Sequence, residues 1–223
     1  LKALVVLLVM GIAAFATLKG ITAVLRVATV DAVHLELAVN ASLTRLDVSY
    51  NQLDEESTLG IVRAAREKDA RGGEKMVLLG LTRCSVGPVG AQEIADYIAV
   101  SASLTSLNLY WNSIDSEGGV AIAEALRANT SLKMLNLMWT NIGDVGGVAI
   151  GEALRVNASL TELNLAASYF RPQGGKAIGE AMAVNTSLTD LNLVSNDLGP
   201  EGGAALADAL RVNTSLTSLD IGN

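Results

Sequence analysis

The sequence predicts an α/β solenoid, a stack of similar units that each contain one strand and one helix. The first observation is a fixed period. The pattern of the segment 104–131 (LTSLNLYWNSIDSEGGVAIAEALRANTS) recurs at a constant interval, starting again at Leu132, Leu160, Leu188 and Leu216. The second observation is a change of spacing within each unit, from alternating apolar residues to apolar residues at helical spacing. Periods of this size are the sequence signature of stacked-repeat proteins.

The composition limits the function classes. The chain has 223 residues, half of them hydrophobic, so it is long enough for one sizeable domain or solenoid and too apolar for a disordered chain. Its formal net charge of -7 argues against a nucleic-acid-binding surface, where a basic stripe is expected. The carboxylates recur at fixed repeat positions, which favours a role in solubility over an acidic docking site. A single cysteine, Cys84, excludes an internal disulfide framework and favours a reducing, intracellular compartment.

Residues 1–42 form an apolar segment with three competing interpretations. The stretch 3–18 carries no charge and lies between Lys2 and Lys19. A degenerate N-terminal repeat or cap is favoured, because the terminal units of solenoids are commonly atypical. A membrane-associated segment, with membrane contact through residues 3–25, is the first alternative, although the uncharged stretch falls just short of the usual span. A signal peptide is the second, since Ala14-Phe15-Ala16 forms a small-x-small site.

The repeat domain is expected to cover residues 43–223. Its units start near Leu43, Met76, Leu104, Leu132, Leu160 and Leu188, with a partial unit at Leu216. The starts are evenly spaced from Met76 onward, whereas the step from Leu43 to Met76 is longer. We expect the additional residues in the charged, glycine-containing stretch 67–75, which is predicted to be a solvated turn.

Each unit is predicted to contain a strand and then a helix. In the unit that starts at 104, Leu107 and Leu109 alternate as in a strand, and a Gly-Gly pair at 118 and 119 is expected to start the helix. The side chains expected to point inward are Leu104, Leu107, Leu109, Ile114, Ile122 and Leu126, with their counterparts in later units, including Phe170 and Met182.

An asparagine recurs where each helix is expected to end. We expect it to close the helix in the left-handed conformation, which asparagine tolerates. These residues are Asn129, Asn157, Asn185 and Asn213, and together with Asn40 they also form Asn-x-Ser/Thr glycosylation sequons. Because the turn explains the recurrence, we interpret these asparagines as structural.

The pattern LxxLxLxxN followed by a helix resembles the leucine-rich repeats of the ribonuclease-inhibitor-like class. The resemblance covers residues 43–223 well and residues 1–42 poorly. It implies a horseshoe with parallel strands on the concave face and helices on the convex face. It also implies that the asparagine ending the motif bonds neighbouring loop backbone. That asparagine is present as Asn51, Asn112 and Asn196 and replaced by Cys84, Thr140 and Ser168, so weaker bonding is expected at three turns.

No catalytic or metal-binding constellation is found in the sequence. The single histidine, His34, falls in a helix expected over 29–38 and lies far from Cys84, which is expected to be partly buried and inert. Gly174-Gly175-Lys176 lacks the rest of a phosphate loop. The row Glu124, Glu152, Glu180 and Asp208 is expected to be solvated, with Arg127, Arg155 and Arg211 within reach for helical ion pairs. We therefore expect no enzyme activity, no cofactor, no metal site and no small-molecule substrate.

The concave face carries the candidate binding site. One column of outward-facing strand residues is uniform (Asn108, Asn136, Asn164 and Asn192), which indicates a structural role. The columns at the strand exits vary, and the candidate partner-binding residues there are Tyr50, Arg83, Tyr110, Trp111, Met138 and Trp139. Since adjacent strands lie roughly 5 Å apart, Trp111 and Trp139 are predicted to be neighbours. Aromatic residues, Arg and Met are enriched at protein interfaces.

Three functions are compatible with these features. The favoured one is a non-enzymatic module or scaffold that binds a protein partner through the concave face and strand-exit loops. The first alternative is a structural subunit of a membrane-associated assembly, anchored by the apolar N-terminal segment. The second is a regulator of an enzyme such as a GTPase, for which Arg83 is the only candidate arginine.

Overall fold

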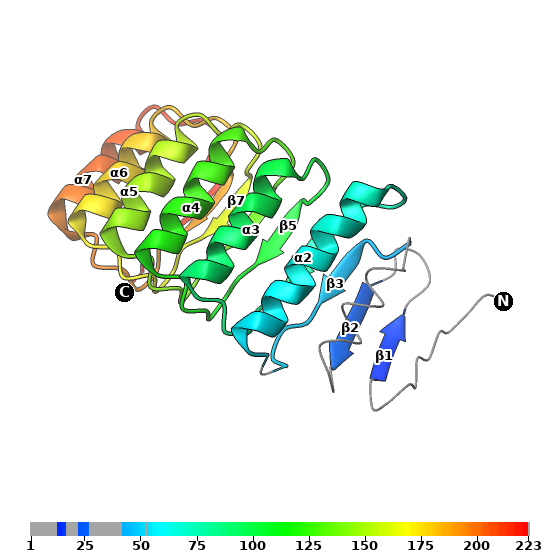
Figure 1. The fold of residues 1–223 in the computed structure, drawn as a ribbon. Helices are drawn as coiled ribbons and strands as arrows, with labels where there is room; N and C mark the ends of the chain where they lie inside the picture. The colour runs from blue at the N-terminus through cyan, green and yellow to red at the C-terminus, as the bar shows by residue number, and fades with distance from the viewer. Residues whose placement is uncertain (1–12, 17–21, 27–41, 52, 223) are drawn as a thin grey trace.

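The computed structural model describes residues 13–16, 22–26, 42–51 and 53–222 of the chain (Figure 1). His34 with its expected helix, Asn40, and most of the apolar segment 3–18 lie outside these residues. The interpretations of residues 1–42 as a cap, a membrane segment or a signal peptide therefore stay predictions. Within the described part of the chain, no helix is both long and apolar enough to cross a membrane.

The described strands form one sheet in which they follow each other in chain order. Strand β1 (Ala13–Ala16) pairs antiparallel with β2 (Thr22–Arg26), and every later pairing is parallel. The repeat strands are β3 (Arg45–Asp47), β4 (Leu78–Gly80), β5 (Ser106–Asn108), β6 (Met134–Asn136), β7 (Glu162–Asn164), β8 (Asp190–Asn192) and β9 (Ser218–Asp220). Each begins two residues after the repeat start expected from the sequence.

One helix follows each repeat strand except the last, within the described residues. These helices are α2 (Glu55–Arg71), α3 (Pro88–Val100), α4 (Asp115–Ala128), α5 (Gly143–Leu154), α6 (Pro172–Met182) and α7 (Gly199–Leu210). Figure 1 shows the helices side by side in one layer that covers one face of the sheet. The prediction of an α/β solenoid with strands on the concave face and helices on the convex face is confirmed.

The central leucine of each strand anchors the core. Leu107 lies opposite Leu135, which lies opposite Leu163, in the parallel register of β5, β6 and β7, and all three are buried. The other side chains expected to point inward are buried through the unit that starts at Leu160, including Phe170 and Met182. Contrary to the expectation, Leu210 and Ile221, the counterparts of Leu126 and Leu109 in the last two units, are about half exposed. Because each unit buries its apolar face only against its neighbours, stability comes from stacking.

The prediction that the Gly-Gly pairs start the helices is wrong. Helix α4 begins three residues before Gly118, and the pair lies in its first turn. The glycines are needed there for close packing: a Cβ on Gly119 would lie 2.9 Å from Ile142 Cβ, and one on Gly147 would lie 3.1 Å from the Gly174 Cα. Such contacts are tighter than normal side-chain packing, so only glycine lets consecutive helices approach this closely.

The additional residues of the first repeat are also placed differently from the prediction. Much of the stretch 67–75 belongs to α2, which runs for 17 residues, and only the part after Arg71 forms a turn, with positive φ at Gly72 and Gly73. Lys68, near the end of this helix, is buried and its Nζ donates to the Glu74 carbonyl. The insertion therefore lengthens a helix as well as a loop.

The asparagines near the helix ends are structural, but not for the predicted reason. None of Asn129, Asn157, Asn185 and Asn213 has positive φ. Instead Asn157 Nδ2 donates to the carbonyls of Leu126 (2.7 Å) and Asn129 (3.1 Å) in the preceding repeat, while its Oδ1 accepts from the Ser159 and Leu160 amides. Asn129, Asn185 and Asn213 repeat this pattern. The side-chain nitrogen of each of these four sequon asparagines donates hydrogen bonds that link two repeats. This hydrogen bonding explains why asparagine recurs at these positions.

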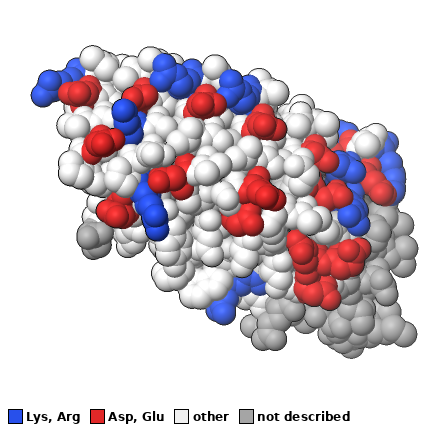
Figure 2. Space-filling view, turned by 60° about the vertical axis from the view of Figure 1, so that its left-hand side comes forward, with Lys and Arg blue, Asp and Glu red and all other residues white. Residues whose placement is uncertain are grey.

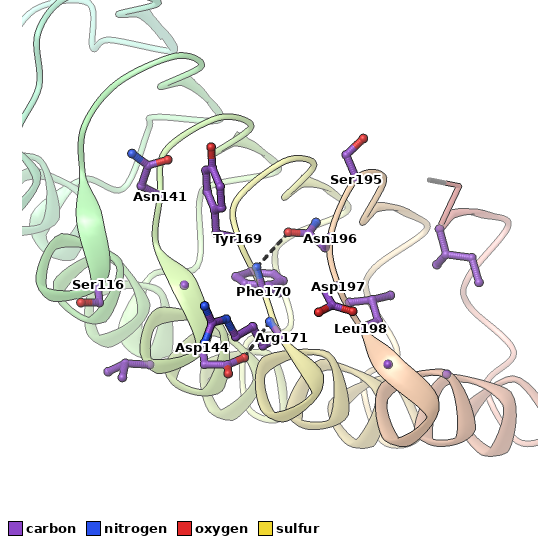
Figure 3. Close-up of a pocket in the computed structure, with 15 residues that line it drawn as sticks. Ser116, Asn141, Asp144, Tyr169, Phe170, Arg171, Ser195, Asn196, Asp197 and Leu198 are labelled. Atoms are coloured by element: carbon purple, nitrogen blue, oxygen red, sulfur yellow. Dashed lines mark hydrogen bonds between the residues drawn. The ribbon is translucent and has the colours of Figure 1, made fainter.

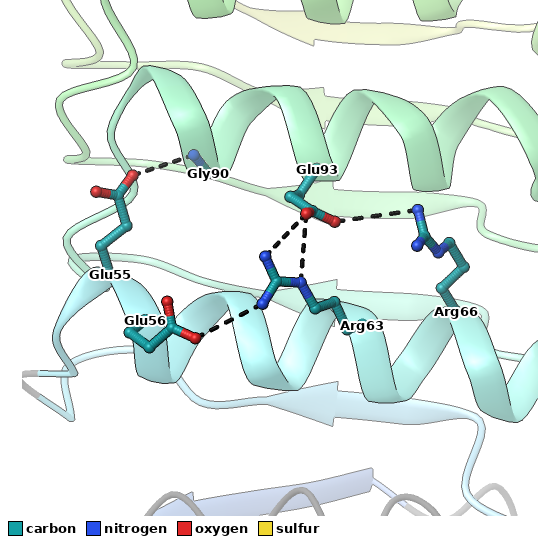
Figure 4. Close-up of polar contacts among 6 residues, drawn as sticks. All are labelled: Glu55, Glu56, Arg63, Arg66, Gly90 and Glu93. Carbon is teal, nitrogen blue, oxygen red and sulfur yellow. Dashed lines mark hydrogen bonds and ion pairs between the residues drawn. The ribbon is translucent and has the colours of Figure 1, made fainter.

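Charged side chains on the helices are dispersed and form bonds between repeats. Arg63 Nη2 of α2 lies 2.9 Å from Glu93 Oε1 of α3, while Glu55 Oε1 accepts the amide of Gly90 (Figure 4). Arg127 pairs with Glu152 of the next repeat at 3.6 Å rather than with Glu124, whereas Arg211 pairs with Asp208 as expected. Figure 2 shows acidic and basic side chains interspersed over the face in view. Such exposed pairs contribute little to stability, typically about 0.2–1 kcal/mol each.

The core register gives a direct prediction. Leu135→Ala or Leu163→Ala should lower the free energy of unfolding by about 2–5 kcal/mol, because each leaves a cavity between two stacked repeats. Leu210→Ala is the matched control, since Leu210 is half exposed in α7 and its loss should cost less than about 0.5 kcal/mol. The measurement is unfolding in urea. Losses below about 0.5 kcal/mol at both core leucines would contradict the register.

Candidate functional site

The candidate residues lie where the chain leaves the strands. Tyr50, Arg83, Trp111 and Trp139 occupy the same position in four consecutive repeats, and all four have left-handed backbones with φ between 53° and 62°. Ala167 (φ 49°) and Ser195 (φ 57°) continue the same position in the next two repeats. We call these six residues the exit column. The sequence pattern predicted the column but not its backbone conformation.

Backbone hydrogen bonds hold the exit column in line. The amide of Arg83 donates to the Tyr110 carbonyl, that of Trp111 to Met138 and that of Trp139 to Ala166, each at 3.0 Å. The parallel pairing therefore continues past the short strands. The uniform asparagine column supports the same turn, since Asn108 Oδ1 accepts from the Tyr110 amide at 3.0 Å, and its equivalents do likewise. The structural role predicted for that column is confirmed.

The structure brings four of the candidate residues together. The indole rings of Trp111 and Trp139 are stacked with centroids 5.0 Å apart and an interplanar angle of 9°. Tyr110 meets Trp111 edge-on at 5.9 Å, and the Arg83 guanidinium carbon lies 4.8 Å from the Trp111 ring centroid. The predicted neighbourhood of the two tryptophans is confirmed. We call Arg83, Tyr110, Trp111 and Trp139 the aromatic ladder.

The remaining two candidates are less closely joined to the ladder. Tyr50 is 62% exposed, and no ring contact links it to another described residue. It lies one repeat before Arg83. Met138 precedes Trp139 and its sulfur lies 3.9 Å from Asn164 Nδ2. Both are therefore at the margin of the ladder.

The tryptophans of the aromatic ladder are partly exposed to solvent, although ring and cation–π contacts hold them in place. Trp111 is 43% exposed and Trp139 is 42% exposed, whereas the leucines two residues before each of them are buried. Isolated exposed apolar residues need no explanation, but contiguous apolar patches commonly mark interaction sites. Whether these residues bind a partner stays a prediction.

A groove lies beside the exit column and was not predicted. It has a volume of about 980 Å³ and runs between the exit loops and the starts of α5, α6 and α7. Figure 3 shows Asn141, Tyr169 and Ser195 along one side and Asp144 with Arg171 near the helices. Asp144 Oδ1 accepts the amides of Arg171 (2.9 Å) and Gly174 (2.8 Å), which caps α6. The lining comes from loops of several repeats, so no single residue type or stretch of sequence indicated this groove.

Beneath the ladder, the motif asparagines tie the loops together. Asn112 Oδ1 accepts the amides of Cys84 (3.1 Å) and Val86 (3.0 Å), and its Nδ2 donates to the Leu81 and Leu109 carbonyls at 2.8 Å. Thr140, at the same position one repeat later, donates only to Leu137 in its own repeat. The expectation of weaker bonding where this asparagine is replaced is met at this turn.

Cys84 occupies the same position and is fully buried. Its Sγ lies 3.4 Å from the Val48 carbonyl. Burial, with a smaller contribution from the nearby Asp47 carboxylate, raises the pKa of the thiol from 9.0 to about 12. The thiol is therefore protonated at neutral pH, and its neutral form is the one that the fold stabilises. Within the described residues, no group of three or more His, Cys, Asp or Glu side chains could hold a metal ion.

The thiol pKa gives a second prediction. At about pH 8, Cys84 should react with Ellman's reagent far more slowly in the folded protein than in denaturant, since the thiolate fraction is on the order of a thousandfold smaller. Because the folded-state pKa is raised, this group also makes stability fall as the pH rises from about 9 towards 12. Equal labelling rates with and without denaturant would contradict the burial of Cys84.

Comparisons with known proteins agree with this architecture. A family model described as "Leucine Rich repeat" matches residues 39–57, 100–123, 128–151 and 184–207. A solved structure titled "Leiomodin-1 Actin-Binding Site 2" is 28% identical and covers 59% of this chain and 78% of its own, with a TM-score of 0.55. A tropomodulin C-terminal domain from Caenorhabditis elegans is 16% identical and covers 69% and 91%, with a TM-score of 0.57. The second likeness shows the fold alone. A search of curated proteins finds no match.

The ribonuclease-inhibitor-like subtype is not resolved by these comparisons and stays a prediction. Three observations agree on the repeat architecture: the regular repeat period from Met76 onward, the parallel sheet with helices between successive repeat strands, and a family model that matches parts of four repeats. The chain contains leucine-rich repeats and folds as a leucine-rich-repeat solenoid.

Proposed function

We propose that this chain is a non-enzymatic interaction module that binds a protein partner through its concave face and strand-exit loops. The observation that carries the proposal is the placement of two large aromatic side chains at left-handed backbone positions. A left-handed backbone costs a residue other than glycine about 1–2 kcal/mol, and Asn or Gly would be better suited. The backbone therefore does not explain why tryptophan occupies the exit column at 111 and 139.

Packing does not explain the tryptophans either. The leucines that point into the core beneath them, Leu109 and Leu137, are fully buried, and neither tryptophan belongs to the core cluster of buried residues. Each tryptophan residue keeps more than two fifths of its surface exposed. A protein partner that covered this surface would remove apolar area from water, which is the main favourable contribution to association.

The ladder is also suited to binding because it is held in place before a partner arrives. The rings stack on each other, Arg83 and Tyr110 hold Trp111 from two further directions, and the loop backbones are hydrogen-bonded in line. Little side-chain freedom is left to lose on binding, and such losses cost about 0.5–1.5 kcal/mol per immobilised side chain. Tryptophan, tyrosine and arginine are the residue types that dominate binding energy at interfaces.

The variant Trp111→Ala/Trp139→Ala tests the proposal. Affinity purification from native cells with quantitative mass spectrometry should recover at least one protein with the wild-type chain and lose it with this variant, because the ladder's apolar area is gone. The matched control is Val156→Ala/Val184→Ala, which removes exposed apolar area elsewhere. Circular dichroism must show both variants folded. An unchanged set of copurified proteins in the ladder variant would refute the proposal.

Actin is the first candidate partner to test, since the leiomodin-1 structure that resembles this chain carries an actin-binding site. The full chain should cosediment with filamentous actin or bind labelled actin monomers, and the ladder variant should bind less. Binding that the ladder variant retains would place an actin site elsewhere on the chain. Absence of binding to both forms of actin would remove actin as the partner.

The two alternative functions stay predictions with separate tests. Retention in membranes after an alkaline carbonate wash would favour a membrane-associated subunit, whose segment 3–25 lies largely outside the described residues. Stimulated nucleotide hydrolysis by a small GTPase would favour an enzyme regulator. Arg83, the arginine considered for that role, lies over the Trp111 ring.

A further inference from the structure

The aromatic ladder stops abruptly at one end. Arg83, Trp111 and Trp139 come from three consecutive repeats, so the guanidinium and the second indole lie on opposite sides of Trp111. The next position of the exit column is Ala167, which has only a methyl group. Among the residues that the structure describes, Trp139 has no ring or cation–π contact other than its stacking on Trp111.

The repeat spacing matches the distance at which one further flat group would stack on Trp139. Neighbouring parallel strands lie about 5 Å apart, and the indoles repeat at the matching distance of 5.0 Å. A planar group above Ala167 would therefore stack on Trp139 as Trp139 stacks on Trp111. The position beyond is the small residue Ser195, which together with Tyr169 lines the groove (Figure 3).

The other end of the ladder indicates which group fits. There the guanidinium of Arg83 lies over Trp111 at 4.8 Å. Guanidinium is planar and weakly hydrated, and it stacks on indole more readily than other protein cations do. The other face of Trp139 offers the same chemistry, and no aromatic or cationic side chain of the described residues stacks on it.

The exposed carboxylates at the starts of β7 and β8 and in the groove outnumber the basic side chains there, Lys133 before β6 and Arg171, and so favour a cation over an anion. Glu162 and Asp190 are exposed, lie opposite each other in the register of β7 and β8, and form no salt bridge within the described residues. Asp197, two residues after Ser195, is exposed in the groove. The basic residue of the groove, Arg171, lies at its helix end, where its amide bonds Asp144 (Figure 3).

The distances suit an extended segment of a protein. Glu162 lies five residues before Ala167. Strand β7 covers Glu162–Asn164 and the chain then turns at 166–167, so the two positions are at most roughly 16 Å apart. An extended segment of about five residues spans that length. One arginine could then stack on Trp139 while neighbouring basic residues face Glu162 and Asp190.

We propose that the face of Trp139 above Ala167 receives an arginine side chain from a basic, extended segment of the protein partner. This inference rests on the proposed function and adds the chemistry of the partner to it. Nucleic-acid bases also stack on indoles, but the phosphates that accompany them would meet the Glu162, Asp190 and Asp197 carboxylates.

The test uses the full chain and three synthetic Gly-Ser peptides that differ only at spaced positions, which carry arginine, lysine or citrulline. The chain has two tryptophans, both in the ladder, so indole fluorescence and the indole N–H signals in NMR report on this site alone. The arginine peptide should bind most tightly, lysine less, and neutral citrulline at least about tenfold more weakly than arginine. Equal affinity of the arginine and citrulline peptides would overturn the proposal, as would tighter binding of a single-stranded oligonucleotide.

The sharpest variant extends the ladder instead of removing it. Ala167→Trp adds a third indole at the exit-column position where tryptophan already occurs in two repeats, so the new ring should stack on Trp139. The affinity for the arginine peptide should then fall about 2- to 30-fold. Val184→Trp, at an exposed site in a loop after α6, is the matched control and should leave affinity unchanged. Undiminished binding to a folded Ala167→Trp protein would overturn the proposal.

A second variant keeps the test decisive if Ala167→Trp fails to fold. Glu162→Gln/Asp190→Asn removes two surface charges. It should lower the affinity for the arginine peptide several-fold and reduce the salt dependence of that affinity. No change in either quantity would count against the proposal. The outcomes are separable from those of the proposed function: if the ladder variant loses its native partner but no arginine peptide binds, the interaction module stands and the arginine assignment falls.

Discussion

The structure depends on parallel pairing at a constant offset between equivalent residues from β4 onward. This offset places equivalent residues of successive repeats beside each other, so that leucine meets leucine in the core and asparagine meets backbone carbonyl at the helix ends. No repeat buries its apolar face alone. The same offset places the residues of the exit column beside each other. It thereby determines which surface side chains can be in contact.

Because equivalent residues lie beside each other, a different residue in one repeat changes the contacts of its neighbours in the same column. Gly80 takes the place of an asparagine in the column that starts at Asp47, and a Cβ there would lie 2.4 Å from Asp47 Oδ1. Ala167 takes the place of a tryptophan in the exit column. Gly80 makes room for the Asp47 carboxylate, whereas Ala167 provides no ring that could stack on Trp139.

Much of the fold was predictable because it follows from periodicity. The order of strands and helices and most of the inward leucines, with Leu210 as an exception, were predicted correctly, since burial on one face forces period 2 and then period 3.6. The predicted helix starts were wrong because the Gly-Gly pairs, a combination that usually interrupts helices, lie inside the helices. There Gly119 and Gly147 allow neighbouring helices to pack closely. The predicted left-handed backbone at the helix ends was wrong because Asn157 acts through side-chain hydrogen bonds. A recurring asparagine fits either role, so the sequence pattern does not distinguish them.

The candidate site was predictable only in part. The adjacency of Trp111 and Trp139 followed from strand spacing alone. The guanidinium over Trp111, the separation of Tyr50 and the left-handed exit backbone depend on rotamers and loop geometry that the sequence does not encode locally. The groove beside Tyr169 arises from three loops in different repeats, so no single stretch of sequence indicates it.

The central claim, that partners bind at the strand exits, is tested most directly by hydrogen exchange of the chain with and without its copurified partner. The account predicts slower exchange in peptides that cover 108–113 and 136–141, with the helices α4 to α6 unchanged. Protection confined to the helices, with exchange at both exits unaltered, would contradict it.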